Sequence, residues 1–180
     1  LKFSEVPSDL IATQSSAFVW LNALKSPISG TLKGSLEASG ELGHLEVSLD
    51  IANGILQPDA TSSPLGFDRL VTYFTYKPKS QILNFDSVSF ASTDISLKAE
   101  GDASIETNEN QGVSLVGQFV LNDIILNPQN AYLTPINVDF ATIDFQFLVD
   151  PFELHLKELY ANDKVRNIEA RMSAVVSTDS

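Results

Sequence analysis

The fold is decided by residues 45–58, LEVSLDIANGILQP. From Leu45 to Ile51 every second residue is apolar and the residues between them are polar, a period of two that is typical of a strand with one buried face. Asn53-Gly54 follows soon after, and this pair favours a tight hairpin turn because both residues tolerate positive φ. The stretch therefore predicts a strand, a turn at Asn53-Gly54 and a second strand.

A second stretch with the same plan lies at residues 114–128, SLVGQFVLNDIILNP. Its alternating residues from Leu115 to Leu121 correspond to those of the first strand. Asn122-Asp123 stands close to the position of the first turn. The same strand–turn–strand arrangement is therefore expected a second time.

One amphipathic helix is predicted near the start of the chain, at residues 9–24 within the segment 7–26. Ser8 or Asp9 is expected to cap it by accepting a free backbone N–H. Ser26-Pro27 should end it, because the residue before a proline avoids the helical region. The apolar stripe of this helix consists of Leu10, Ala17, Leu21 and Leu24.

The rest of the chain alternates with a period of two, with one irregularity that occurs twice. Leu83 and Phe85 share one phase, whereas Val88 takes the other. Leu159 shifts in the same way relative to Leu156. A slip inside a strand indicates a β-bulge, in which one extra residue re-aims the side chains that follow.

These patterns predict a mainly β chain with a single domain, residues 1–180, built from two tandem antiparallel β-meander repeats. The repeats are expected at residues 29–106 and 113–178, each of about 70 residues, and a repeat of this kind indicates units that stack on their neighbours. About ten strands should form one strongly curved sheet, with the N-terminal helix capping or plugging one end.

Composition and charge exclude several classes of function. The formal net charge of −12 repels nucleic acid phosphates and anionic lipid headgroups. The absence of cysteine removes disulfides, zinc thiolate sites and thiol catalysis. His44 and His155 lack the spacing of a metal site, and the sequence has no nucleophile elbow or phosphate loop. We therefore expect no enzymatic activity, no cofactor and no metal.

The alternating strands carry more apolar surface than the predicted helix can cover. A sheet with one apolar face needs a partner layer, and a helix of four turns is only about 24 Å long. Either the sheet packs on itself around an ordinary closed core, or an acyl chain fills the trough and gains about 0.8 kcal/mol per buried methylene. The candidate residues of such a lipid groove are Leu49, Ile51, Leu70, Phe74, Tyr76, Leu83, Phe85, Phe119, Leu121, Ile143, Phe145, Phe147, Leu154 and Leu156.

A family resemblance covers most of the chain, with the first repeat matching better than the second, and it rests on five segments. They are FVWL (18–21), GTLKGSLEASGEL (30–42), LDIANGILQP (49–58), PLGFDRL (64–70) and LKAEGDASI (97–105). In these segments the chain resembles the AsmA-like envelope proteins of Gram-negative bacteria, whose larger relatives include TamB and YhdP. The second repeat departs from the pattern, with Asp123-Ile124 in place of Asn53-Gly54.

The resemblance implies a section of a long periplasmic β structure that is anchored in the inner membrane by a segment outside this chain. Such proteins form a taco-like groove with an apolar interior, and they are thought to move phospholipid between the inner and outer membranes. The expected partners are thus phospholipid or another acyl-chain lipid, and the remainder of a longer membrane-anchored chain. Nucleic acid is not expected, and the family has no catalytic residues to carry over.

Two other functions stay open at this point. A non-catalytic structural or protein-binding β-module of the envelope would have a closed, dry core and no ligand. An enzyme acting on an envelope polymer would require a deep polar cleft with clustered carboxylates.

Overall fold

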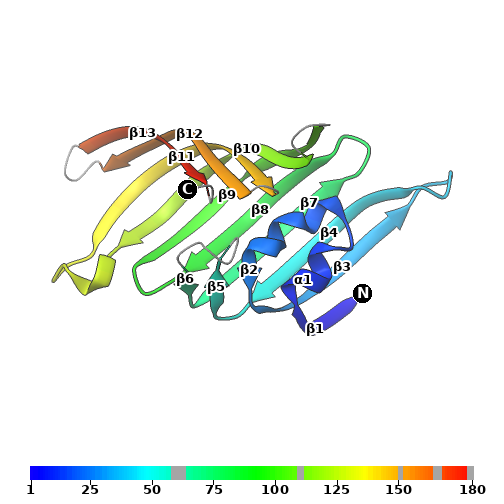
Figure 1. Ribbon diagram of the computed structural model, residues 1–180, viewed down its shortest axis with the longest axis horizontal. Helices are drawn as coiled ribbons and strands as arrows, with labels where there is room; N and C mark the ends of the chain where they lie inside the picture. The colour runs from blue at the N-terminus through cyan, green and yellow to red at the C-terminus, as the bar shows by residue number, and fades with distance from the viewer. Residues whose placement is uncertain (58–63, 109–111, 150–151, 164–167, 178–180) are drawn as a thin grey trace.

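One large antiparallel sheet organises the molecule (Figure 1). A computed structural model describes residues 1–57, 64–108, 112–149, 152–163 and 168–177. In these residues, ten strands pair in the order β1-β3-β4-β7-β8-β9-β10-β11-β12-β13. Their bounds are Lys2–Pro7 (β1), Pro27–Leu36 (β3), Leu42–Ile51 (β4), Arg69–Lys77 (β7), Ile82–Ala91 (β8), Ile95–Asn108 (β9), Gly112–Leu126 (β10), Ile136–Val149 (β11), Phe152–Asp163 (β12) and Ile168–Ser177 (β13). The prediction of a mainly β fold with a large antiparallel sheet is confirmed.

The predicted hairpin at Asn53-Gly54 is wrong. Both edges of β4 are already hydrogen-bonded, one to β3 and the other to β7, so no edge is left for the strand that follows it. That strand, β5 (Gly54–Leu56), instead joins a small separate sheet between β2 (Leu24–Lys25) and β6 (Leu65–Phe67). Gly54 does not have positive φ; a Cβ there would lie 2.8 Å from the carbonyl oxygen of Lys25, so the position requires close backbone approach.

The second strand–turn–strand arrangement is also absent. Strand β10 continues through Asn122-Asp123 to Leu126 without a reversal of direction. Asp123 has a φ of 52°, and the register between β9 and β10 shifts at this point. The sequence irregularity at Asn122-Asp123 is therefore a bulge inside one long strand, and the connection to β11 comes later, through the short 3₁₀ helix η2 (Pro128–Asn130).

The predicted N-terminal helix is broken in two. The α-helix α1 covers only Ser8–Ala12, and a 3₁₀ helix, η1, covers Ser16–Ala23. Ser15 between them is extended, and its hydroxyl accepts a hydrogen bond from the Ala17 N–H, which starts a new helix. Serine and threonine compete for backbone hydrogen bonds in this way, and this explains why the run from Thr13 to Ser16 interrupts the helix.

The predicted cap and one residue of the predicted stripe are wrong as well. Pro7 occupies the N-cap position of α1 and makes no side-chain capping bond, although the Asp9 carboxylate within the first turn accepts a hydrogen bond from the Leu10 N–H over 2.9 Å. The Ser8 hydroxyl instead donates to the carbonyl oxygen of Leu24. Leu10 is exposed, while its neighbour Ile11 is buried. The change from an α-helix to a 3₁₀ helix alters the angular spacing of the side chains, so a stripe drawn at α-helical spacing misses part of the buried side.

The two predicted bulges are confirmed. The register between β7 and β8 shifts by one residue, with Asp86 as the extra residue of β8. The register between β11 and β12 shifts likewise, with Lys157 as the extra residue of β12. Because of these shifts, Val88 and Leu159 pack in the hydrophobic clusters despite their changed phase.

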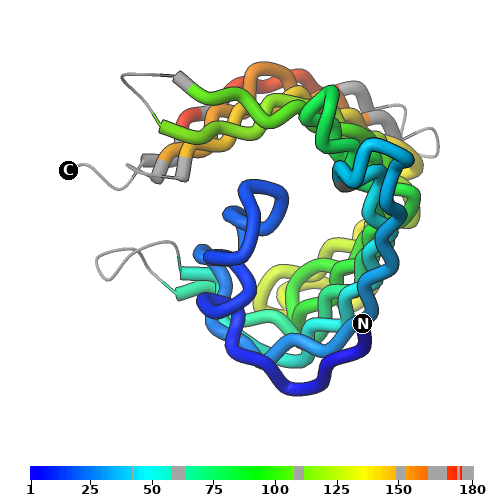
Figure 2. Tube along the Cα trace, turned by 90° about the vertical axis from the view of Figure 1, so that its right-hand side faces the viewer, coloured from blue at the N-terminus to red at the C-terminus, as the bar shows by residue number. Residues whose placement is uncertain are grey.

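The sheet is curved, and its apolar face is the concave one. Figure 2 shows the strands arranged along an arc, with the helical segment that follows β1 inside it. We refer to residues 8–24 as the cover segment. Its buried side chains Phe18 and Leu21 pack in one cluster with Leu49 and Phe74 of the sheet. The main core therefore lies between the cover segment and the concave face.

We predict that Thr72→Val stabilises the protein. Thr72 is on the concave face and is 1% exposed, and its hydroxyl oxygen has no hydrogen-bond partner among the described residues. Valine has nearly the same shape and removes an unsatisfied buried polar atom, so the free energy of unfolding should rise by about 1 kcal/mol. Urea denaturation measures the change. Thr75→Val, at a half-buried position on the other face, is the control, and an equal gain there would contradict the explanation.

Candidate functional site

The concave face brings together nearly all of the residues predicted for a lipid groove. Thirteen of the fourteen belong to one continuous hydrophobic cluster that also contains the cover segment. The remaining residue, Leu121, lies in a second cluster with Ala99, Ile124 and Ala141. Phe119 and Ile143 pack against both clusters, so the two clusters adjoin.

A series of aromatic rings crosses this face from strand to strand. We call Phe18, Phe74, Phe85, Phe119 and Phe145 the aromatic ladder. Successive ring centroids lie 6.2, 5.2, 5.2 and 5.3 Å apart. These separations are within the range at which aromatic pairs attract one another beyond simple burial. The ladder links the cover segment to β7, β8, β10 and β11.

The ladder is continuous across β9 because β9 has a glycine at that level. Gly101 pairs with Phe85 on one side and with Phe119 on the other. Strands two apart in a sheet are separated by roughly 9.5 Å, so the two rings can meet only if no side chain stands between them. Gly117 has a related role on β10, since it is directly opposite Phe145.

Burial differs between the two ends of the concave face. On β4, β7 and β8 the most deeply buried apolar side chains, Leu49, Ile51, Phe74 and Leu83, are at most 1% exposed, whereas Leu70 near the start of β7 is partly buried. On β11 and β12 Phe145 is 9% exposed, but the other described side chains of the cluster are only partly buried, namely Ile143, Phe147, Leu154 and Leu156. The cover segment thus seals one part of the face more completely than the other, even though η1 also approaches β11 across the concave side.

Several residues of this face were missed by sequence reasoning. Ile105 and Leu115 are buried and pair directly across β9 and β10. Ile105 lies two residues after Ala103 and Leu115 two residues before Gly117, so each pair shares one face of its strand. This spacing could have identified both residues, but alanine and glycine make the alternation of apolar and polar residues hard to recognise. Phe18 joins the ladder from the cover segment, and nothing in the local pattern indicates which strand it meets.

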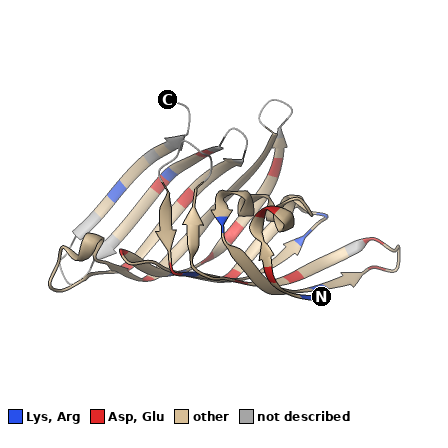
Figure 3. Ribbon diagram, turned by 60° about the horizontal axis from the view of Figure 1, so that its bottom comes forward, with Lys and Arg blue, Asp and Glu red and all other residues tan. Residues whose placement is uncertain are grey.

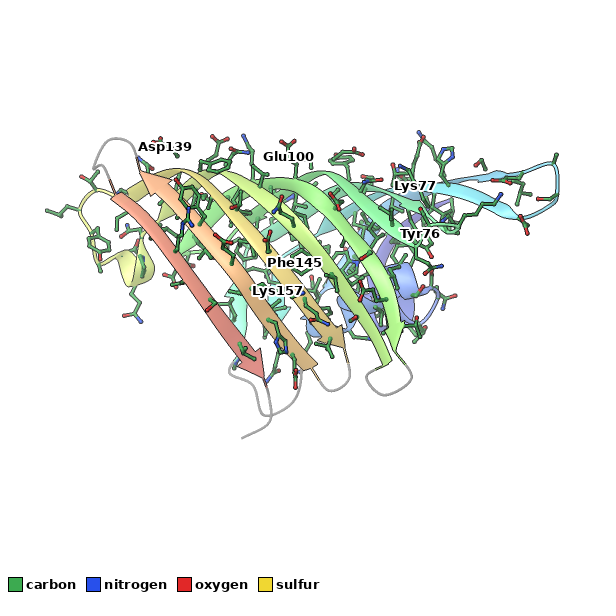
Figure 4. All side chains as sticks on the ribbon, turned by 90° about the horizontal axis from the view of Figure 1, so that it is seen from above. Tyr76, Lys77, Glu100, Asp139, Phe145 and Lys157 are labelled. Carbon is green, nitrogen blue, oxygen red and sulfur yellow. The ribbon has the colours of Figure 1, made fainter. Side chains whose placement is uncertain are left out.

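The convex face is polar and carries ion pairs. Figure 4 views the sheet from this side, and charged residues such as Glu100 and Lys157 are exposed there. Arg69 binds Asp50 through two hydrogen bonds of 3.0 and 2.7 Å, and this contact lowers the pKa of the Asp50 carboxyl. Lys98 donates to Asp123 over 2.8 Å, which raises the pKa of Lys98. This face is therefore suited to water rather than to an apolar ligand.

The surface has two shallow recesses. One, of about 410 Å³, is bordered by residues of the convex face such as Lys33, Glu46 and Tyr73. The other, of about 560 Å³, lies beside the Lys98–Asp123 ion pair. Neither has a cluster of chemically reactive groups. In the described part of the chain, no three His, Asp or Glu side chains lie close enough together to hold a metal ion.

His155 is on β12, where its ring nitrogen Nε2 lies 2.6 Å from Glu153. His44, on β4, lies near Glu46, with 3.7 Å between Nε2 and the carboxylate. Each histidine thus has one carboxylate partner, consistent with an isolated surface contact.

Among the helices of the described residues, none has the length and apolar character needed to cross a lipid bilayer.

These features define a curved β protein whose large sheet has an apolar concave side. Searches against protein-family models, curated proteins and solved structures give no match for this chain.

Proposed function

We propose that the concave face is a groove that binds acyl chains of phospholipid or a related lipid. The observation that carries this proposal is the uneven burial of the face. The cover segment seals Leu49 and Phe74, whereas Leu154 and Leu156 on β12 stay partly exposed in the same cluster. Partly exposed apolar side chains on a concave, uncharged surface are what an acyl chain requires.

The energetics favour such a ligand. Each buried methylene contributes about 0.8 kcal/mol, so ten methylenes contribute about 8 kcal/mol before the entropic costs of binding. The cover segment packs on Leu49 and Phe74, and η1 also approaches β11, so the partly exposed Leu154 and Leu156 of β12 mark the place for the chain. The aromatic ladder continues into this part through Phe119 and Phe145, which stack with an interplanar angle of 7°.

We further propose that the chain is a section of an AsmA-like periplasmic protein that conducts lipid between the inner and outer membranes of a Gram-negative cell. In this proposal, residues 29–106 and 113–178 are tandem repeats, and the matched bulges at Asp86 and Lys157 support that division. The anchor in the inner membrane lies on a segment outside this chain. In this proposal, lipid acyl chains move along the groove, and no residue of the chain has a catalytic role.

Lipid extraction tests the groove. We expect the purified chain to carry phospholipid that is detected by mass spectrometry, and to take up a fluorescent fatty acid. Leu156→Glu places a charge in the partly exposed part of the face and should reduce uptake about tenfold or more, since each buried leucine contributes roughly 1.5–3 kcal/mol. Lys157→Glu, the adjacent exposed position, is the matched control and should retain uptake.

Two results would overturn the proposal. One is a chain that carries no lipid and takes up no fatty acid. The other is equal uptake by the Leu156→Glu and Lys157→Glu variants. A thermal midpoint that does not respond to added lipid would then favour a structural or protein-binding module with a dry core.

A further inference from the structure

The two ends of the long axis carry projecting tips of opposite character. At one end is the turn between β3 and β4, at residues 37–41, and at the other is the connection between β10 and β11, at residues 127–135 (Figure 4). We call these the acidic tip and the uncharged tip. Each displays an exposed leucine: Leu36 next to the acidic tip is 76% exposed, and Leu133 in the uncharged tip is fully exposed.

The uncharged tip has no ionic character over a long stretch. Residues 124–138, IILNPQNAYLTPINV, contain no Asp, Glu, Lys, Arg or His in a chain whose net charge is −12. Figure 3 shows the loop of this tip in tan, without charged positions of its own, whereas the opposite tip carries acidic ones. In the acidic tip, Glu37 and Glu41 both lie within ion-pair distance of Lys79. Leu133, Tyr132 and Ile125 are all exposed within this stretch, and apolar side chains gathered in this way are typical of a contact surface.

The uncharged tip is held in a fixed shape that keeps Leu133 exposed. The Asn127 side chain accepts a hydrogen bond from the Tyr132 N–H over 3.0 Å. The carboxylate of Asp94, on the neighbouring β8–β9 connection, accepts one from the Gln129 N–H over 2.7 Å. Gln129 and Asn130 have φ values of 51° and 53°, a region that non-glycine residues rarely adopt. None of these bonds buries Leu133, so the loop is ordered for something other than the core.

From this tip we infer that the protein docks on the surface of a phospholipid bilayer without net charge. Leu133 enters the acyl boundary, and the half-exposed Tyr132 lies at the headgroup level, where a phenol ring finds both an apolar and a wet environment. Ile125, at the end of β10 and 43% exposed, widens the apolar contact. The negative chain is repelled by anionic headgroups, and the tip offers no lysine or arginine to offset this, so the zwitterionic surface is the one that fits.

This docking surface is separate from the proposed groove, because no residue of the uncharged tip belongs to the groove candidates. The groove proposal and the docking proposal can therefore be tested independently of each other. Leu156→Glu should reduce acyl-chain uptake without affecting docking, and Leu133→Asp should weaken docking without affecting uptake.

Fluorescence with vesicles tests the docking. In a Trp20→Phe background, Leu133→Trp and Leu36→Trp place the only indole at either tip. With phosphatidylcholine vesicles, we expect a blue shift and quenching by brominated acyl chains for Leu133→Trp but not for Leu36→Trp. In flotation assays Leu133→Asp should weaken vesicle partitioning about tenfold or more, and Leu36→Asp should leave it unchanged.

Three outcomes would overturn the inference. The first is an indole at position 133 that shows no shift or quenching with vesicles. The second is an equal response from the two tips. The third is a shift that occurs without vesicles and follows protein concentration in sedimentation, which would make a second copy of the chain the partner.

Discussion

Phe74→Ala is expected to lower the free energy of unfolding by about 3–5 kcal/mol. Phe74 is 1% exposed and contacts two other rings of the aromatic ladder, Phe18 at 6.2 Å and Phe85 at 5.2 Å between centroids. Removing it leaves a cavity at the point where the cover segment meets the sheet. The two neighbouring rings are fixed on two different elements, η1 and β8, so they cannot easily collapse into the space.

Urea denaturation of the Phe74→Ala variant gives the change directly. Tyr73→Ala is the matched control: it removes an aromatic ring of similar size from the next position of β7, on the opposite face, where Tyr73 is 50% exposed. It should cost far less than Phe74→Ala. If the two variants lose the same stability, the concave face is not the main core.

Gly101→Ala is expected to destabilise the protein by about 1–3 kcal/mol, although it adds only one methyl group. A Cβ at Gly101 would overlap the carbonyl oxygen of Gln118 and lie 3.0 Å from the Cα of Phe119. These are backbone atoms of β10, so they can move only if β9 and β10 separate. That separation weakens the backbone hydrogen bonds between β9 and β10, and it moves the rings of Phe85 and Phe119 apart.

Gly66→Ala is the control for this change. Gly66 lies in β6, and a Cβ there would have no atom within 4 Å. Since alanine also restricts the unfolded chain, this substitution should be neutral or stabilise by up to about 1 kcal/mol. Thermal denaturation of both variants checks the pair. Similar losses for Gly66→Ala and Gly101→Ala would show that the cost is generic to glycine in these strands and does not come from the contact with β10.

The features that sequence reasoning predicted are those that depend on neighbouring residues. The alternation from Leu45 to Ile51 determines which side chains share a face, and the slips at Val88 and Leu159 mark bulges because an extra residue changes the phase of everything after it. The same local rule explains why the fourteen groove candidates turn toward the hydrophobic clusters.

The features that could not be predicted depend on parts of the chain far apart in sequence. Asn53-Gly54 is a good hairpin signal, but the hairpin requires a free edge on β4, and β3 and β7 occupy both edges. The choice of concave side, and the unequal burial of Leu49 and Leu154, depend on where the cover segment docks. No local pattern in residues 8–24 specifies that position.

The order of the strands has a consequence for folding. From β7 to β13, each strand is hydrogen-bonded to the one that follows it in the chain, so each pairing closes only a short loop. Sequential pairing of this kind gives a low contact order for a β protein, and the sheet can form by successive addition of strands. The cover segment cannot be added in this way, because its partners on β7 and β11 come close together only after the sheet has formed and curved. Its docking is therefore the natural last step.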